Sequence, residues 1–127
     1  MLERAIEKND LPTEAQARRL IGGAFRVRGD LDRALEQLKR AHEIYTHIGD
    51  QRGVAFALGN IGSALRLRGD YEQALECQRS ALRMFEEFGD REQVAGQLNN
   101  LGQVYMSMNR ADDALDVERA AVRRQPP

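Results

Sequence analysis

Apolar and small residues recur three or four positions apart along the chain, with polar and charged residues between them. In the middle of the chain, Leu58, Ile61, Gly62 and Leu65 stand at i, i+3, i+4 and i+7. A second stripe of the same kind consists of Ala74, Leu75, Ala81, Leu82 and Phe85. This spacing places each stripe on one side of an α-helix, and the period-two alternation typical of strands is absent. The pattern predicts amphipathic helices over residues 51–68 and 70–88.

Glycine followed by aspartate separates the predicted helices. Gly69 and Asp70 lie between the two helices described above, and Gly89 and Asp90 follow the second one. Glycine takes the left-handed conformation that ends a helix at little cost. An aspartate carboxylate accepts hydrogen bonds from the free N–H groups of the next helix. We therefore expect Asp70 and Asp90 to cap the helices that they precede.

The whole pattern repeats with a period of forty residues. Residues 15–54 align with residues 55–94 without a gap and with sixteen identities, and a weaker third copy starts at Ala95. The expected repeats are residues 11–50, 51–90 and 91–127, and residues 1–10 look like the tail of a preceding helix. Each copy reads as two antiparallel helices. Such a hairpin is too thin to bury its apolar face alone, so the copies should stack into one all-α domain over residues 1–127.

Composition indicates a soluble protein. The 127 residues are 42% hydrophobic and 31% charged, which is ordinary for a globular domain. The chain has neither a signal-peptide pattern nor an apolar run long enough to span a membrane, and Cys77 is its single cysteine. One unpaired thiol fits a reducing compartment. We expect a cytoplasmic location, no membrane contact, and a packed or half-exposed Cys77.

Motifs for catalysis or for metal binding are missing from the sequence. His42 and His47 are five residues apart and should lie on different faces of a helix, so no metal site is expected there. Met84, Met106 and Met108 are interpreted as packing residues. Since phosphate-binding loops, nucleophile elbows and zinc spacings are also absent, we expect no enzymatic activity, no metal and no cofactor.

The repeated residues resemble the signature of the tetratricopeptide repeat family. The matching residues are Leu58, Ile61, Gly62, Leu65, Ala74 and Ala81 in the second copy, and Leu98, Leu101, Gly102, Tyr105, Ala114 and Ala121 in the third. The resemblance covers about residues 12–125. The forty-residue period and the segment LNNLGQVY at Leu98 are most similar to the longer-repeat branch of kinesin light chains, Pins-type adaptors and bacterial regulators.

Three residues depart from the family signature. Gln78 and Glu118 stand where the family often has an aromatic residue, and Arg18 replaces the first large residue of copy one. We expect looser packing between helices at these positions.

The resemblance implies a right-handed superhelical solenoid of about three helix hairpins, an all-α fold. It also implies that the first helix of each hairpin lines a concave groove, where a peptide segment of a partner protein binds. Residues 12–28 and 51–68 each carry a net charge of +3, and residues 91–108 carry none. The second helices are negative, although the whole chain has a charge of only −1. A positive groove favours partners with carboxylates.

Asparagines and arginines on the first helices are the candidate contacts. The resembling family uses asparagine amides at the positions of Asn60 and Asn100 to hold a peptide backbone, because an amide both donates and accepts hydrogen bonds. Arg26 and Arg66 follow two turns further along on roughly the same side, and their guanidinium groups suit carboxylates. Solvated polar residues are the alternative interpretation. The predicted peptide-binding residues are Arg19, Arg26, Asn60, Ser63, Arg66, Asn99, Asn100 and Gln103.

Self-assembly is the alternative function. No polar capping helix follows Val122, and stacked repeats need polar caps to stay soluble alone. The ends of the stack could therefore be buried by homo-oligomerisation, and a charge at Leu115 or Val122 should then disrupt the assembly. The chain could equally be a regulatory segment of a longer array. Nucleic-acid binding is not expected, because the net charge is −1 and aromatic residues are scarce.

Overall fold

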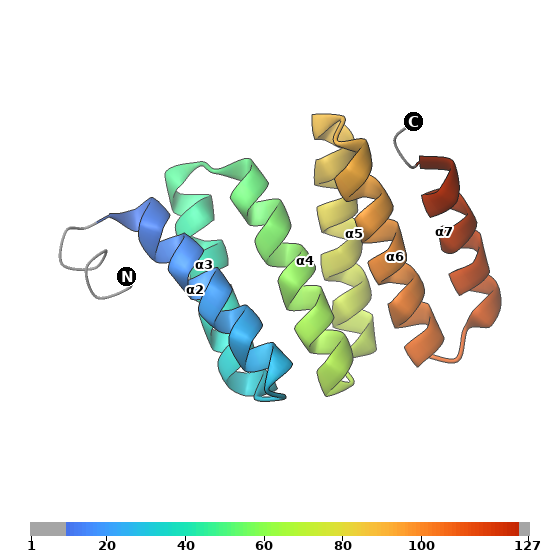
Figure 1. The fold of residues 1–127 in the computed structure, drawn as a ribbon, viewed down its shortest axis with the longest axis horizontal. Helices are drawn as coiled ribbons and strands as arrows, with labels where there is room; N and C mark the ends of the chain where they lie inside the picture. Colours follow the sequence, from blue (N-terminus) through green and yellow to red (C-terminus); the bar gives the residue numbers. More distant parts are fainter. Residues whose placement is uncertain (1–9, 125–127) are drawn as a thin grey trace.

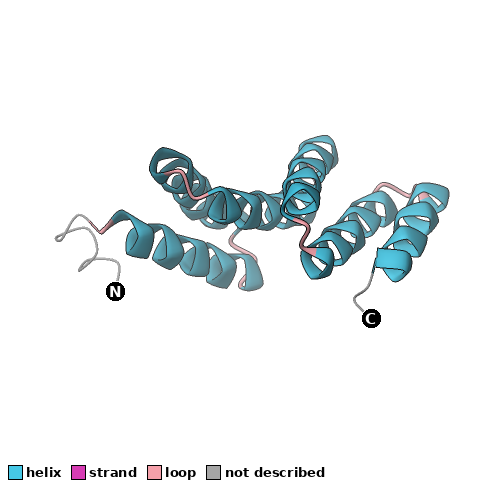
Figure 2. Ribbon diagram, turned by 90° about the horizontal axis from the view of Figure 1, so that it is seen from above, coloured by secondary structure: helices cyan, strands magenta, loops and turns pink. Residues whose placement is uncertain are grey.

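The computed structural model describes residues 10–124, which form six α-helices joined by short loops and contain no strand (Figures 1 and 2). The expected all-α fold is thus confirmed, and the helices begin and end within a few residues of the predicted bounds. The predicted helical tail in residues 1–10 lies outside the described residues except for Asp10. In chain order the helices are α2 (Leu11–Val27), α3 (Leu31–Ile48), α4 (Gln51–Arg68), α5 (Tyr71–Phe88), α6 (Arg91–Ser107) and α7 (Ala111–Arg124).

Glycine and aspartate end and begin the helices as predicted, with one exception. Gly69 and Gly89 have φ angles of +96° and +70°, the left-handed conformation that favours glycine. Asp90 accepts a hydrogen bond from a backbone N–H in the first turn of α6. The predicted cap at Asp70 is wrong, because its carboxylate makes no such bond. It accepts instead from Nε of Arg68, at 2.6 Å.

The helices stack in series along the long axis of the molecule (Figure 1). Each helix packs against the next one in the chain. In addition, the backbone of α4 approaches those of α2 and α6 closely, whereas the backbones of α3, α5 and α7 do not approach one another in this way over the described residues. A side-chain ion pair from Arg124 of α7 to Glu86 of α5, at 3.0 Å, still links those two helices. The first helices of the hairpins therefore lie closer together than the second helices. The side formed by α2, α4 and α6 is the inner side of the curve, as the sequence predicted.

Glycines allow the two helices of a hairpin to approach closely. Gly22 faces the side chain of Leu38, and Gly62 faces Gln78 in the same way one repeat later. Only 1% of Gln78 is exposed, and its Nε2 donates a hydrogen bond to the carbonyl oxygen of Gly59 at 3.0 Å. The expectation of looser packing at Gln78 is therefore wrong. Its amide arm fills the space of an aromatic ring while its N–H group remains hydrogen-bonded.

Long polar side chains also fill the space between helices at the other two departures from the signature. Arg18 is half-buried, and its Nε donates to Glu14 at 2.7 Å while its Nη1 donates to Gln37 of α3 at 3.0 Å. Glu118 is half-buried and lies against Gly102. A large aromatic residue is therefore not needed at these positions, because a long polar side chain spans the same distance.

The neighbouring glycines Gly22 and Gly23 should respond in opposite ways to alanine. A Cβ at position 22 would lie 2.7 Å from Cγ of Leu38 and 3.1 Å from the carbonyl oxygen of Ala34, so Gly22→Ala forces the hairpin apart. We expect a loss of about 1–3 kcal/mol in the free energy of unfolding. A Cβ at position 23 meets nothing within 4 Å, so Gly23→Ala should be neutral or add up to about 1 kcal/mol.

Urea unfolding, monitored by circular dichroism, measures the free energy of unfolding of each variant. Equal effects of the two substitutions would show that helix propensity, and not the close approach, decides stability at this hairpin.

Candidate functional site

The eight predicted contact residues share one face of the first helices. They occupy four positions of the repeat, each represented in two copies, and none of them is buried. Because an α-helix turns by about 100° per residue, the four positions fall within an arc of about 120°. Much of the remaining circumference packs against second helices, and α4 also contacts α2 and α6. We call the exposed arc of α2, α4 and α6 the inner face; its predicted members are Arg19, Arg26, Asn60, Ser63, Arg66, Asn99, Asn100 and Gln103.

Asparagine and arginine stand on opposite edges of the inner face. Asn60 and Arg66 are six residues apart, which separates them by about 120° around α4. The expectation that they share roughly the same side is therefore wrong. Ser63 lies between them, one turn from each. A ligand must cross the width of α4 to contact both Asn60 and Arg66.

Arg19 lies in a cavity of about 420 Å³ between α2 and α4. Its guanidinium carbon is 5.7 Å from the centroid of the Phe56 ring, a distance at which a cation interacts with an aromatic face. The Nε atom of Arg19 is buried and has no hydrogen-bond partner among the described residues. Tyr45 and Arg52 also line the cavity. The cavity thus combines aromatic walls with a guanidinium group that makes no ion pair in the described structure. Asp50 also lines it, with Oδ1 of its carboxylate accepting from the backbone N–H of Gly53.

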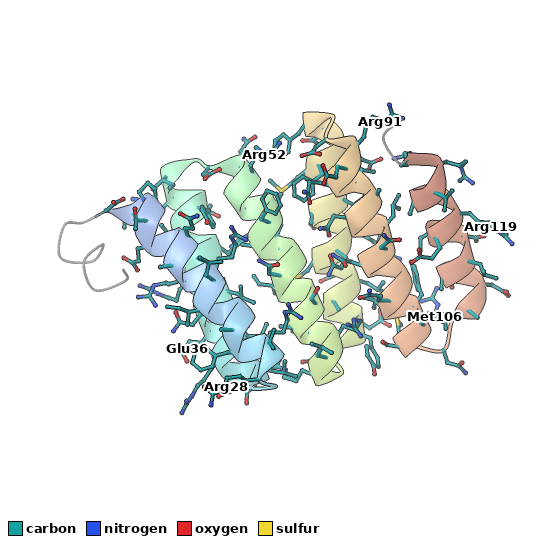
Figure 3. The ribbon with its side chains drawn as sticks, viewed as in Figure 1. Arg28, Glu36, Arg52, Arg91, Met106 and Arg119 are labelled. Carbon is teal, nitrogen blue, oxygen red and sulfur yellow. The ribbon has the colours of Figure 1, made fainter. Side chains whose placement is uncertain are left out.

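Arg52 is already paired. It lies at the start of α4 (Figure 3), where its Nη2 donates to Oδ2 of Asp90 at 2.7 Å and its guanidinium lies 5.5 Å from the centroid of the Phe88 ring. The hydrogen bond from Arg52 lowers the pKa of the Asp90 carboxyl, and the bond from the backbone of Gln93 acts in the same direction. Arg52 therefore links the start of α4 to the start of α6 and contributes less positive charge to the cavity than Arg19.

Counting charge by helix overstates how positive the inner face is. Arg18 pairs with Glu14. Arg68 pairs with Asp70 and with Asp32, and hydrogen bonds to these two carboxylates raise the pKa of its guanidinium above the ordinary range. Three arginines of the first helices, Arg52 included, are thus engaged with carboxylates. The cations of the inner face without an ion pair in the described structure are Arg19, Arg26 and Arg66.

Exposed apolar side chains also occupy the inner face, and sequence reasoning missed them. Leu20, Val27, Leu67 and Met106 are all exposed. Met106 is 61% exposed near the end of α6 (Figure 3), so its interpretation as a packing residue is wrong. Met84 and Met108 do pack against the core, as predicted. The available signal was the forty-residue spacing of Val27 and Leu67, both outside the buried stripe.

The remaining chemical groups fit structural roles. Cys77 is half-buried against the core, and burial, followed by the charge of Glu76, raises the pKa of its thiol. His42 is half-buried and His47 is exposed. Residues 10–124 contain no group of three or more His, Cys, Asp or Glu side chains arranged to hold a metal ion. None of the described helices has the length and apolar character needed to cross a membrane.

Comparisons with known proteins agree with this geometry. A sequence model of the tetratricopeptide repeat family matches residues 13–87 and residues 53–126. The TPR domain of Arabidopsis FLU is similar in structure, with a TM-score of 0.82, 16% identity, and coverage of 90% of this chain and 96% of that domain. BtubC (BKLC) from P. vanneervenii has a TM-score of 0.85 at 20% identity over 97% of this chain. The match covers 52% of BtubC, so this chain spans about half its length. None of the curated proteins matches the chain.

The ion pair of Asp90 should make stability depend on pH. In Asp90→Asn the helix cap is retained, because asparagine also caps well, but the pair with Arg52 is lost. Since the folded pKa of Asp90 is lowered, its contribution is present above the unfolded value of about 3.9 and is lost as the pH falls through the folded pKa. The wild type should exceed the variant in stability at neutral pH, and the difference should shrink in acid.

Thermal unfolding of both proteins between neutral and acidic pH measures this difference. Asp116→Asn, at an exposed aspartate of α7 without an ion pair in the described structure, is the matched control and should show no such pH dependence. If the stability difference between the wild type and Asp90→Asn stays constant with pH, the ion pair with Arg52 is not its source.

Proposed function

The chain belongs to the tetratricopeptide repeat family, whose members generally bind protein partners, and from this premise we propose that its inner face binds an extended peptide segment. The observation that carries the proposal is the gathering of all eight predicted residues on one exposed face of α2, α4 and α6. Those residues are separated along the chain and share a face because the helices repeat every forty residues. An extended peptide can contact several such rungs in succession.

Two kinds of contact support a peptide ligand. The amides of Asn60 and Asn100 are half-buried at equivalent positions of α4 and α6, where each can donate to and accept from a peptide unit of any sequence. The exposed side chains of Leu20, Leu67 and Met106 offer apolar contacts to the peptide side chains. Backbone contacts provide affinity and apolar contacts add preference for sequence.

An acidic residue in the peptide is the specific feature that we propose. Arg19 has its Nε buried without a partner, in a cavity that also contains the aromatic rings of Tyr45 and Phe56. A carboxylate from the peptide would pair with the terminal Nη groups of Arg19, because the buried Nε is closed to a ligand, and the aromatic rings would flank the pair. Since Arg52 is held by Asp90, Arg19 is the main anchor for the acidic group.

The proposed role is binding and not catalysis. The tetratricopeptide repeat fold is in general a non-catalytic interaction scaffold. We further propose that binding takes place in the cytoplasm. The half-buried free thiol of Cys77 supports that location, because a reducing compartment keeps such a thiol intact.

Loss of the two amides should remove peptide binding without unfolding the protein. Selection from a random peptide display library provides peptides that bind the wild type, and fluorescence polarisation measures their affinities. Asn60→Ala combined with Asn100→Ala should lower the affinity for these peptides about tenfold or more, because each substitution removes hydrogen bonds to the peptide backbone. Gln73→Ala, an exposed amide on α5, is the control and should change nothing. Unchanged affinity in the double variant at unchanged helicity would exclude the asparagine contacts.

Arg19 should determine the preference for acidic peptides. Arg19→Gln keeps a polar side chain of similar reach but removes the charge, so selected peptides should lose their enrichment in Asp and Glu. An acidic peptide should bind the variant about tenfold more weakly and with less dependence on salt. Arg68→Gln removes an arginine that is paired with two carboxylates, so it is the control. If both variants select acidic peptides as the wild type does, Arg19 is not the anchor.

A further inference from the structure

The last helix exposes two large apolar residues, and one of them, Leu115, has buried counterparts in both earlier repeats. Leu115 and Val122 of α7 are 50% and 69% exposed. Leu35 and Leu75 occupy the position of Leu115 in the first and second repeats, and each is only 2% exposed. They belong to one core cluster together with residues of α4 and α6, which pack on them. The face of α7 around Leu115 thus has the form of an inter-repeat interface without its covering helix among the described residues. We call it the tail face.

The first helix shows the complementary feature. Ala24 of α2 is exposed, whereas Ala64 and Val104, at the same position of α4 and α6, are fully buried. Ile21 is only partly buried, and its counterpart Ile61 belongs to the core cluster. Ile21 and Ala24 of α2, together with Arg28 directly after it, therefore form the covering surface that α4 and α6 use, without a described helix for it to cover. We call it the head face.

An ion pair within the molecule shows how the two faces match. Nη1 of Arg68, at the end of α4, donates to Oδ1 of Asp32, near the start of α3, at 2.9 Å. The forty-residue period places Arg28 on the head face where α4 has Arg68, and Asp112 on the tail face where α3 has Asp32. Both are exposed, and neither has an ion-pair partner within residues 10–124. The two faces thus carry complementary charges at the positions where an internal interface has a formed pair.

We infer that the tail face of one copy receives the head face of a second copy. In this arrangement, Leu115 packs under Ile21 and Ala24 of the next copy, and Asp112 pairs with Arg28. The two faces lie at opposite ends of the long axis, and the end of α2 and the start of α7 lie on the same side of the molecule (Figure 1). One copy can therefore follow another by the same displacement that relates the repeats within a chain. The interface does not use the inner face, so the inference is independent of the proposed function.

Such an interface joins two different surfaces and therefore does not close at two copies. A symmetric dimer pairs a patch with its own copy, whereas a head-to-tail contact leaves one free face of each kind at every step. Assembly should therefore continue beyond a dimer as the concentration rises. When one chain has a blocked tail face and the other a blocked head face, assembly should stop at a dimer.

Sedimentation velocity on the 127-residue chain tests the inference. The wild type should form species larger than a dimer, in proportions that increase with concentration. Leu115→Glu blocks the tail face and Ala24→Glu blocks the head face, so each variant alone should be monomeric. Because each variant retains the face that the other lacks, an equimolar mixture should form a heterodimer and nothing larger. Formation of that heterodimer also shows that both variants are folded.

Three outcomes would overturn the inference. A wild type that stays monomeric at high micromolar concentration excludes the contact. An Ala24→Glu variant that still dimerises shows that two tail faces pair symmetrically. A mixture that remains monomeric shows that the two faces do not match. Met106→Glu introduces the same charge at another exposed apolar residue away from both faces, and it should assemble like the wild type.

Exchanging the charges tests the orientation of the contact. In an otherwise wild-type chain, Arg28→Asp and Asp112→Arg should each lower the association constant between copies by about two- to fivefold or more. Each substitution places like charges opposite one another. The double variant Arg28→Asp with Asp112→Arg should recover most of the loss, since the pair is re-formed in the reverse sense. Additive losses in the double variant would exclude contact between these residues.

Discussion

The close approach of two helices at a glycine is the constraint on which the rest of the structure depends. Gly22 and Gly62 let the second helix of each hairpin lay a large side chain, Leu38 or Gln78, directly on the backbone of the first. That contact fixes the angle within the hairpin and commits one side of the first helix to its partner. In α4 and α6 a further side is covered by the preceding hairpin. Only the remaining arc faces solvent, and it becomes the inner face because the helices repeat in register.

Local sequence signals were sufficient for the fold but not for the distribution of charge. Helix ends follow from residues in direct succession, such as Gly89 and Asp90, and the period fixes which helices are neighbours. Charge pairing joins residues that are distant along the chain. Arg52 meets Asp90, directly before α6, and Arg68 meets Asp32 of the preceding repeat, so the charges of the first helices are partly neutralised by groups outside those helices. A sum over one helix cannot include such partners.

The sequence predicted which helix faces the candidate residues occupy, but the prediction failed at finer detail. The repeat period correctly assigned Asn60 and Asn100 to equivalent positions, and both are half-buried. The relation between Asn60 and Arg66 failed because six residues do not complete two turns of an α-helix. The prediction that Met106 is a packing residue failed for a different reason. An apolar residue near the end of a helix is consistent with either packing or exposure until the position of the neighbouring helix is known.

The inner face and the two end faces have a common origin, and assembly would connect them. A chain whose third repeat is followed by the first repeat of another copy extends the row of first helices from α6 to the next α2. Along that row, two asparagine rungs, Asn60 and Asn100, would alternate with one apolar rung, Leu20. The cavity at Arg19 would then recur once in every three repeats. A ligand longer than one chain would therefore meet an Arg19 anchor for an acidic group at intervals set by the length of the copy and not by the period of the repeat.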